Sequence, residues 1–454
     1  MLRISPIELA VMAVRRAMAE GATEAEAFVT YSRGYSVSIF AGKIRDVEYD
    51  DDIGVGVRVA VGKKVGFAYA TGAEPGVAAE AARRAVRLAR SAAPDRDWPG
   101  LPEPSPSYPD VGGIYEASLA RVTPEALLDE AKSLIGFVEG YREEGVLLSR
   151  ARIGASVVER AIANSNGVYQ VDAGTYASVM VSTTISREGV TTPAVFVFDS
   201  SRVTMPSVER VAERAIELSR LATRRAEQPS PGRYTVVYAP QALAELLEET
   251  VLFSLRGDMA VRGRSYFRNK IGQQVLSEKI TIVDDGALKG GDASWRFDGE
   301  GVATRRTVLV EEGILRSFVY DTYWGRRAGY ESTGNAVRAG YASRPSVGFT
   351  NVILGEGDAA PEELLEGRVI VVYQVQGAHT ASPETGEYSV LANPAILYEN
   401  GEPRGWVPGL VVSGNMYQEL REKVEAVGKW LEKPYPGIQL PWIRLGGVTV
   451  APRA

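Results

Sequence analysis

Three carboxylates in the segment 242–256, Glu245, Glu248 and Glu249, have a spacing that could support chemistry. The apolar residues of this segment recur at the interval that predicts a helix. Residues three and four apart share one face of a helix, so Glu245 would lie on the face of the other two. Such carboxylates can bind a hard cation or act in acid–base catalysis. A solvated acidic face beside an apolar one is the more common arrangement, and the sequence alone favours it.

A second candidate is His379, the only histidine of the chain. Glycine and hydroxyl residues surround it in the segment 375–383, which predicts a tight loop. An imidazole in such a loop could orient a substrate carbonyl, but a lone loop histidine is more often a structural residue. The run Asp284-Asp285-Gly286 could hold a cation, and we interpret it as a turn because Asp and Gly are common turn formers.

The composition excludes several kinds of catalytic site. The chain has no cysteine, which removes cysteine-based metal sites, thiol nucleophiles and disulfides. A zinc helix with two histidines is excluded as well, and a Ser-His-Asp triad would depend on His379 alone. The glycines show neither the dinucleotide-binding nor the phosphate-loop spacing, so nucleotide binding has no support.

Charge and hydropathy indicate a cytoplasmic protein. The net charge is -6, with acidic and basic residues interleaved, which argues against a nucleic-acid surface. No apolar run reaches the roughly 18 residues of a transmembrane helix, so we expect no membrane association. Charged residues interrupt the first apolar stretch at helical spacing, so the start of the chain predicts an amphipathic helix from Pro6 to about Gly21 rather than a signal peptide.

The elements that must position these residues fall into an α+β fold of three parts. Residues 1–92 predict an N-terminal α+β domain, and the prolines of 93–110 predict a linker. Residues 111–226 repeat the order of helix, strands and helix and predict a middle α+β domain. Residues 227–454 predict a β-rich C-terminal domain that is barrel- or sandwich-like, with many short strands between glycine turns.

Within the first two parts, apolar alternation between turn residues predicts short strands. The C-terminal part should open with a strand at 234–238, followed by the helix that holds the three carboxylates. The expected strands of the first two parts are 24–32, 35–41, 44–49, 54–61, 65–69, 146–159, 161–173 and 175–186.

The C-terminal part contains a set of short motifs that follow one another in a fixed order. They are Gly257-Asp258, Arg262-Gly263-Arg264-Ser265, Ile271-Gly272-Gln273-Gln274-Val275, Thr281-Ile282-Val283-Asp284-Asp285-Gly286, Asp298-Gly299-Glu300-Gly301-Val302, Gly313-Ile314-Leu315, Asp321, Ser332-Thr333-Gly334-Asn335, Glu399-Asn400-Gly401 and Ser413-Gly414-Asn415. With these motifs, and with the segments 42–48 and 54–58, the chain resembles the TldD/PmbA family. The middle part matches that family only in its overall pattern.

The resemblance implies a degenerate metal site. TldD-type members are metallopeptidases with a His-Glu-x-x-x-His helix just before the Gly-Asp motif. Counted back from Gly257-Asp258, the first histidine falls on Glu248, the glutamate on Glu249 and the second histidine on Phe253. A further family ligand is a cysteine, which this chain lacks. A catalytic zinc normally takes three protein ligands, and a phenyl ring has no lone pair to donate.

This departure resembles the PmbA (TldE-like) branch of the family. The resemblance implies a non-catalytic subunit, with no cofactor of its own, that pairs with a zinc-bearing TldD-type metallopeptidase subunit in a heterodimer. The pair would act on extended, unstructured peptides. Two alternatives stay open: a self-sufficient metallopeptidase with an atypical site around Glu248, Glu249 and His379, and a peptide-binding homodimer or larger homo-oligomer without catalysis.

Overall fold

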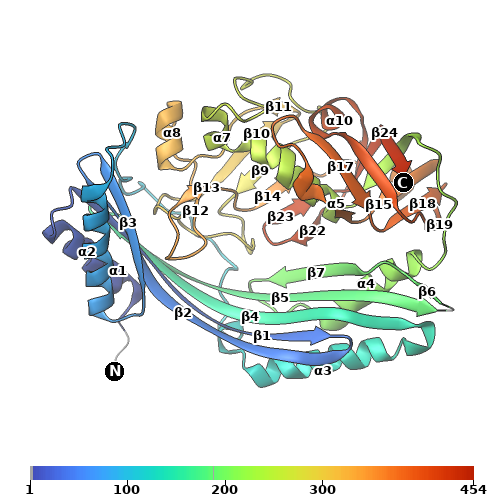
Figure 1. Cartoon of the computed structure of the whole chain (residues 1–454), viewed down its shortest axis with the longest axis horizontal. Coiled ribbons are helices and arrows are strands. Elements are labelled where there is room, and N and C mark those ends of the chain that lie inside the picture. The colour runs from blue at the N-terminus through green and yellow to red at the C-terminus, as the bar shows by residue number, and fades with distance from the viewer. Residues whose placement is uncertain (1–3, 188, 454) are drawn as a thin grey trace.

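A computed structural model describes residues 4–187 and 189–453 of the chain. A long, curved sheet formed by residues before 226 bends around a strand-rich C-terminal part (Figure 1). The helices of the N-terminal part are α1 (Pro6–Ala19), α2 (Pro75–Ser91), α3 (Pro124–Glu139) and α4 (Val208–Leu221), with short turns η1 (Leu119–Arg121) and η2 (Arg142–Glu144). Its strands are β1 (Glu24–Phe40), β2 (Lys43–Val61), β3 (Lys64–Thr71), β4 (Val146–Asn164), β5 (Tyr169–Arg187), β6 (Val190–Thr191) and β7 (Val195–Ser201).

Local sequence signals set the helix starts. Helix α1 begins at Pro6 after Ser5, whose side chain and that of Glu8 form a reciprocal cap. Helix α3 begins at Pro124 after the capping residue Thr123. Proline suits the first helical position because its missing N–H would have no partner there.

The strands of the first two predicted parts form one sheet in the order β3-β2-β1-β4-β5-β6, and β7 pairs with β5. The shorter strands that the sequence predicts merge into long ones, since β1 runs unbroken through Arg33-Gly34. Pairing on both sides satisfies the backbone of β1, so a polar side chain does not end the strand. Gly34 fits there because a Cβ would stand 2.8 Å from the Cβ of Ser156.

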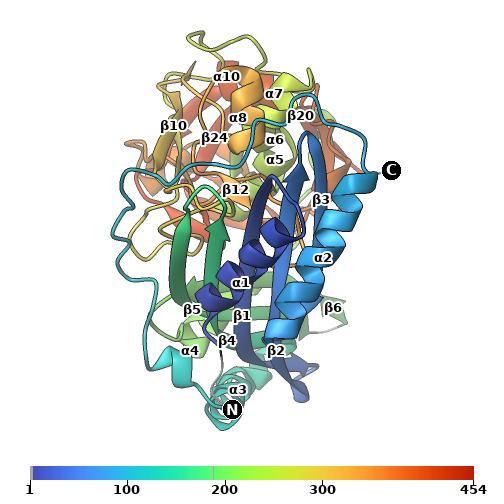
Figure 2. The same cartoon turned by 90° about the vertical axis from the view of Figure 1, so that its left-hand side faces the viewer.

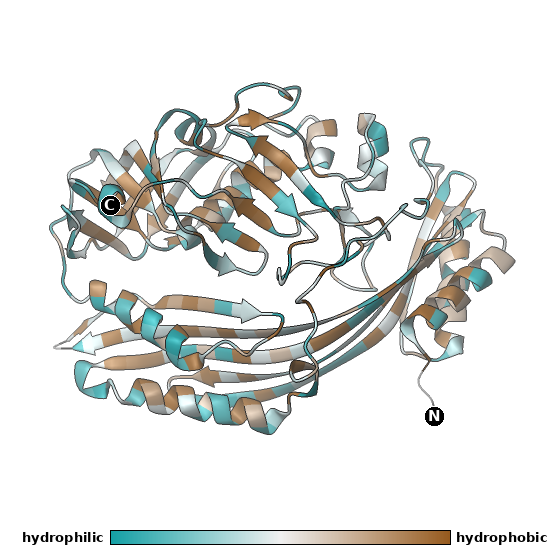
Figure 3. Cartoon of the chain, turned by 180° about the vertical axis from the view of Figure 1, so that it is seen from behind, coloured by the Kyte–Doolittle hydropathy of each residue, from teal (hydrophilic) through white to brown (hydrophobic). Residues whose placement is uncertain are grey.

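Two separate cores lie against this shared sheet. Helices α1 and α2 lie side by side on one end of it (Figure 2), over a core rich in Ala and Val. Helices α3 and α4 cover the other end, with Leu127, Leu134 and Ile216 buried against the strands. Apolar and polar bands alternate along the long strands (Figure 3), as expected for a sheet with one face in a core.

The C-terminal part is rich in short strands. Its helical segments are α5 (Pro240–Leu247), η3 (Glu248–Leu252), α6 (Phe253–Leu255), α7 (Gly257–Val261), α8 (Thr322–Ala328), α9 (Pro361–Leu364), η4 (Ala378–Thr380) and α10 (Met416–Glu422). Its strands are β8 (Gly232–Tyr238), β9 (Ile282–Asp285), β10 (Arg306–Glu311), β11 (Ile314–Leu315), β12 (Ala336–Val337), β13 (Ser346–Val347), β14 (Val352–Leu354), β15 (Arg368–Val372), β16 (Val375–Gln376), β17 (Glu387–Ala392), β18 (Ala395–Glu399), β19 (Glu402–Trp406), β20 (Leu410–Asn415), β21 (Val424–Val427), β22 (Glu432–Tyr435), β23 (Ile438–Leu440) and β24 (Ile443–Pro452).

A nine-stranded sheet and a six-stranded sheet enclose the main C-terminal core. That core holds residues of both sheets, such as Val236 and Ile282, together with the apolar face of α5. The expected α+β fold with a β-rich C-terminal domain is therefore confirmed. The apolar face of the helix with the three carboxylates packs in this core. The core therefore holds the polar face of the helix in a fixed position on the outside.

A buried ionic network joins the C-terminal part to the curved sheet. Arg58 of β2 bonds to Glu26 of β1 at 2.7 Å and to Glu300 of the C-terminal part at 2.9 Å. Arg338 pairs with the other oxygen of Glu26. All of these side chains are almost fully excluded from solvent. Buried charges of this kind persist only when they are paired, so the network holds the two parts in one arrangement.

A close backbone approach reinforces that junction. The carbonyl oxygen of Tyr341 would stand 1.9 Å from a Cβ at position 56, so only glycine lets the loop reach the sheet. The hydroxyl of Tyr341 also donates to Asp52 at 2.7 Å. The segment around Gly56 therefore contributes to the contact between the curved sheet and the C-terminal part.

Candidate functional site

The carboxylate helix widens at the position of the candidate residues. Helix α5 begins at Pro240 and passes at Glu248 into η3, a π-helical turn that ends at Leu252. The Thr250 hydroxyl donates to the Leu246 carbonyl oxygen at 2.5 Å inside this turn. The sequence predicts the helix but not its widening, because the apolar spacing alone does not report a single extra residue. Single π turns occur frequently at functional sites.

Glu245 is half-buried and fixed by hydrogen bonds. The Tyr435 hydroxyl of β22 donates to Glu245 at 2.8 Å. The same hydroxyl lies 3.4 Å from the amide nitrogen of Gln241, whose oxygen accepts from Gln374 at 3.0 Å. Burial raises the pKa of Glu245, against the lowering effect of the Tyr435 bond. Glu245 is thus part of a polar chain between α5 and β22.

Glu248 and Glu249 point away from the core. The Glu248 side chain is exposed and that of Glu249 is half-buried. The surrounding protein raises the pKa of Glu248 by desolvation, and the charge of Glu249 raises it further. The two carboxylates therefore form a like-charged pair on the outer face of η3. Such a pair favours uptake of a proton or of a cation over two free negative charges.

Phe253 occupies a different environment from a metal ligand. The Arg264 guanidinium lies over the Phe253 ring, 5.5 Å from its centre. Arg264 also pairs with Glu384 at 2.7 Å. A phenyl ring has no lone pair for a metal, and the cation stacked on it repels another cation. Position 253 and its neighbours do not fit a zinc ion.

The inner side of η3 is fixed to α10 by Tyr417. The Tyr417 hydroxyl lies 2.9 Å from the Thr250 carbonyl oxygen and 2.7 Å from Ser254 Oγ. Its ring stacks on Tyr266 with the ring centres 4.2 Å apart. Sequence reasoning misses this contact because Tyr417 is far along the chain and aromatic residues are ordinary core residues.

His379 lies in the short turn η4, beside α5, with its side chain exposed. Within residues 4–187 and 189–453 it has neither a hydrogen bond nor an ion pair. The structure therefore brings its loop near the carboxylate helix but does not join the imidazole to Glu248 or Glu249. The described residues also contain no group of three or more His, Cys, Asp or Glu side chains placed to hold a metal ion.

The acidic motifs further along the chain have structural partners. Asp284 is buried and accepts hydrogen bonds from Asn335 at 2.6 Å and from the Thr350 amide at 2.7 Å. Asp285 accepts from the Ala287 amide in the turn that follows β9. Asp298 accepts from three backbone amides, although burial and then the charge of Glu300 raise its pKa to about 7.

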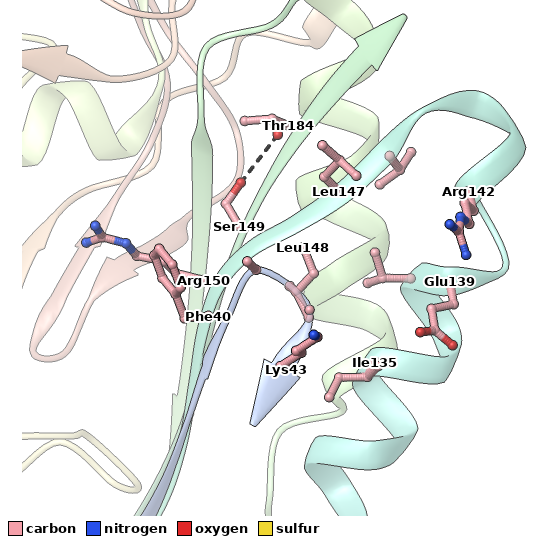
Figure 4. Close-up of a pocket in the computed structure, with 14 residues that line it drawn as sticks. Phe40, Lys43, Ile135, Glu139, Arg142, Leu147, Leu148, Ser149, Arg150 and Thr184 are labelled. Carbon is pink, nitrogen blue, oxygen red and sulfur yellow. Dashed lines mark hydrogen bonds between the residues drawn. The ribbon is translucent and has the colours of Figure 1, made fainter. Parts of the chain in front are cut away.

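Two of the surface hollows formed by the described residues lie near the ends of α5 and α3. One, of about 350 Å³, includes Gln241 of α5 together with Lys433 and Trp442, and so adjoins the polar chain of Glu245. The other, of about 530 Å³, lies between the end of α3 and the tips of β1, β2 and β4, where Phe40 and Leu147 are exposed (Figure 4). The second hollow contains none of the candidate residues.

The described residues form no helix that is both long and apolar enough to cross a membrane.

A curved sheet joined to a strand-rich part that carries an acidic helix places the protein in the α+β class. The chain matches, in order, the family models for PmbA/TldA metallopeptidase domain 1 over residues 25–93, the central domain over 118–223 and the C-terminal domain over 231–452. It thus belongs to the PmbA/TldD family, as the motifs of the C-terminal part indicate.

Relatives of nearly the same length support this assignment. An uncharacterized protein of Methanocaldococcus jannaschii is 30% identical over 88% of this chain and 91% of its own length. Metalloprotease PmbA of Escherichia coli O157:H7 is 26% identical over 90% of this chain and 88% of its own. The crystal structure of TldE from Thermococcus kodakarensis superposes with a TM-score of 0.89 at 28% identity, over 96% of this chain and 98% of that one.

Proposed function

We propose that this chain is the non-catalytic subunit of a TldD/TldE-type metallopeptidase that acts on unstructured peptides in the cytoplasm. A TldD-type subunit would supply the zinc ion in a heterodimer. The chain itself would position an extended peptide and complete the enclosure around it, with no cofactor of its own. The structural likeness to TldE of Thermococcus kodakarensis supports this role.

The observation that supports it best is the environment of Phe253. The family resemblance assigns a histidine ligand to this position, and the side chain present is a phenyl ring under the Arg264 guanidinium. Glu384 fixes that guanidinium in place. Activation of water by zinc needs ligands that hold the metal and leave one position open. The pair of Phe253 and Arg264 supplies neither.

The remaining side chains have roles without a metal. Glu249 and Glu248 add negative charge to an outward-facing turn, where they can hold a peptide amino terminus or a basic side chain. Glu245 stiffens α5 through Tyr435. Proton transfer at the peptide bond is left to the partner subunit.

The test is reconstitution with a TldD-type subunit from the same source, measured as cleavage of an unstructured peptide. We expect no cleavage by this chain alone and cleavage by the mixture. Glu249→Gln in this chain should leave the rate of the mixture within about threefold, an allowance of less than 1 kcal/mol in activation free energy. The glutamate of the partner's metal helix should be indispensable.

The opposite result would identify this chain as the enzyme. Chelator-sensitive cleavage by this chain alone, abolished by Glu249→Gln or by His379→Ala, would overturn the proposal and favour the self-sufficient hydrolase. Arg264→Gln serves as the matched control, because it removes the guanidinium next to Phe253 and leaves Glu245, Glu248 and Glu249 in place. Peptide binding without cleavage under any combination would favour the homo-oligomeric alternative.

A further inference from the structure

Strand β2 continues well beyond the end of its outer neighbour. Strand β3 pairs with β2 only over residues 54–61, whereas β1 pairs with β2 from Lys43 to Ala60. Among the described residues, nothing pairs with the outer side of 43–52. Figure 1 shows this stretch along the rim of the curved sheet. A strand edge of this kind presents unpaired N–H and C=O groups at every second residue.

The solvent exposure of β2 changes at the point where its pairing with β3 ends. Residues 47–52 are exposed, whereas 54–60 are buried beneath the pairing with β3. The open edge contains no proline, so its backbone can donate throughout. The register of β2 against β1 shifts at Arg45, and beyond this bulge residues 46–52 form a regular strand edge that is still competent to pair.

The two faces of this open edge differ in chemistry. Alternate residues of a strand share a face. Four carboxylates share the face that looks toward the C-terminal part, where Tyr341 contacts the last of them: Asp46, Glu48, Asp50 and Asp52. The opposite face presents Val47 and Tyr49, which are 47% and 56% exposed, and then Asp51, which accepts a hydrogen bond from the Tyr49 hydroxyl at 3.0 Å. An added strand would therefore meet a row of negative charge on one side, and the two apolar side chains followed by a single carboxylate on the other.

Nearby cations neutralise only part of the acidic row. Arg45 pairs with Asp46 at 2.5 Å, and Arg152 pairs with Glu48 at 2.7 Å. Asp50 and Asp52 have no arginine or lysine partner in the described chain. Two copies of this edge laid side by side would place like charges opposite each other, which is destabilising. The charge thus selects against self-pairing and in favour of a basic strand.

We propose that the open edge of β2, residues 46–52, binds an extended polypeptide segment as an added strand. The segment has Lys or Arg at alternate positions, facing the carboxylate row, and apolar residues between them, facing Val47 and Tyr49. Directly opposed residues of paired strands have Cβ atoms about 4.5–5.5 Å apart, within reach of a Lys–carboxylate contact. Main-chain hydrogen bonds supply affinity, and the alternation supplies specificity.

This surface lies on the N-terminal sheet, apart from the carboxylate helix, and binding there needs neither hydrolysis nor a partner subunit. If no peptide binds this edge, the proposed role as a non-catalytic subunit is therefore unaffected. Loss of the proposed function would likewise leave this surface as a peptide-binding edge.

The test uses the full chain and fluorescent peptides of strand length, followed by fluorescence anisotropy. An alternating Lys–Val peptide should bind, and an alternating Glu–Val peptide should not. Two further Lys–Val peptides are N-methylated, one at the Lys residues and one at the Val residues. Because one edge uses only alternate amides, one methylated peptide should keep its affinity and the other should lose at least tenfold.

Charge reversal supplies the protein-side test. Asp46→Lys with Asp50→Lys should weaken binding of the Lys–Val peptide more than tenfold. The matched control, Glu356→Lys with Asp358→Lys, changes the net charge equally at exposed positions of the C-terminal part and should change affinity less than threefold. Equal binding of both methylated peptides, or equal loss in both double variants, would refute strand addition and indicate diffuse electrostatic attraction. If the peptide displaces a second copy of this chain from the edge, then the edge pairs with itself. That result would refute the inference that its negative charge prevents self-pairing.

Discussion

Removal of Arg58 should destabilise the whole protein through the buried network that joins its two parts. In Arg58→Met, Glu300 and one oxygen of Glu26 lose their cationic partner. Breaking a buried ion pair by removing one member costs about 3–5 kcal/mol, since the other charge stays buried. Glu26 keeps its ion pair with Arg338, and Glu300 keeps its hydrogen bond from the Thr322 amide. We therefore expect the free energy of unfolding to fall by about 3 kcal/mol, the lower end of this range.

The loss should depend on pH. The charge of Arg58 is the largest influence that lowers the pKa of Glu300, against desolvation. A carboxyl whose folded pKa is depressed stabilises the protein above its unfolded pKa, and that stability is lost as the pH falls. Without Arg58, Glu300 can take up a proton, which removes most of the penalty in acid. The destabilisation should therefore be larger at pH 8 than at pH 4.

The assay is urea unfolding of wild type and variant at both pH values, with midpoints compared at equal slope. Arg316→Met is the matched control, because Arg316 pairs with Glu311 at 3.0 Å on the surface. An exposed pair contributes about 0–1 kcal/mol. Arg58→Met with Glu300→Gln should recover part of the loss, since the unpaired charge is gone. A loss no larger than that of the control, or equal at both pH values, would refute the role assigned to the network.

Two further predictions concern the same junction. Burial, and then the charge of Glu300, raise the pKa of Asp321 to about 8. The folded state therefore retains a proton that the unfolded state releases. Because of this difference, the free energy of unfolding falls as the pH rises toward 8. Asp321→Asn keeps an oxygen for the Trp324 amide and should flatten that decline in urea midpoints between pH 5 and 9; an unchanged slope would contradict it. Gly56→Ala should cost about 1–3 kcal/mol in thermal or urea unfolding through overpacking against Tyr341. Gly76→Ala in α2, where a Cβ meets nothing within 4 Å, should cost nothing; equal losses would contradict the close-approach explanation.

The sequence located much of the candidate site but not its environment. Helical spacing indicated that Glu248 and Glu249 would face outward, because a helix is a local structure that reports its faces through periodicity. Periodicity could not report that Glu245 bonds to Tyr435 or that Arg264 covers Phe253. These contacts join segments that only the packed core brings together.

By itself, the sequence determined the chemistry that is absent and the local elements. The lack of cysteine and the single histidine exclude whole classes of site whatever the fold, because composition does not change on folding. Proline and capping residues set helix starts such as Pro6 and Pro124, since a cap acts within one turn. The family motifs of the C-terminal part likewise needed no coordinates to be recognised.

Only the tertiary structure decided how the parts combine. Pairing of β1 with β4 unites the two segments that flank the Pro-rich stretch 93–110 in a single sheet, and their register brings Arg58 to Glu300. The end of β3 leaves the acidic rim of β2 open. Strand pairing depends on main-chain hydrogen bonds between distant segments, and these are nearly independent of side-chain identity. For that reason the sequence specifies the strands of this protein more clearly than it specifies their neighbours.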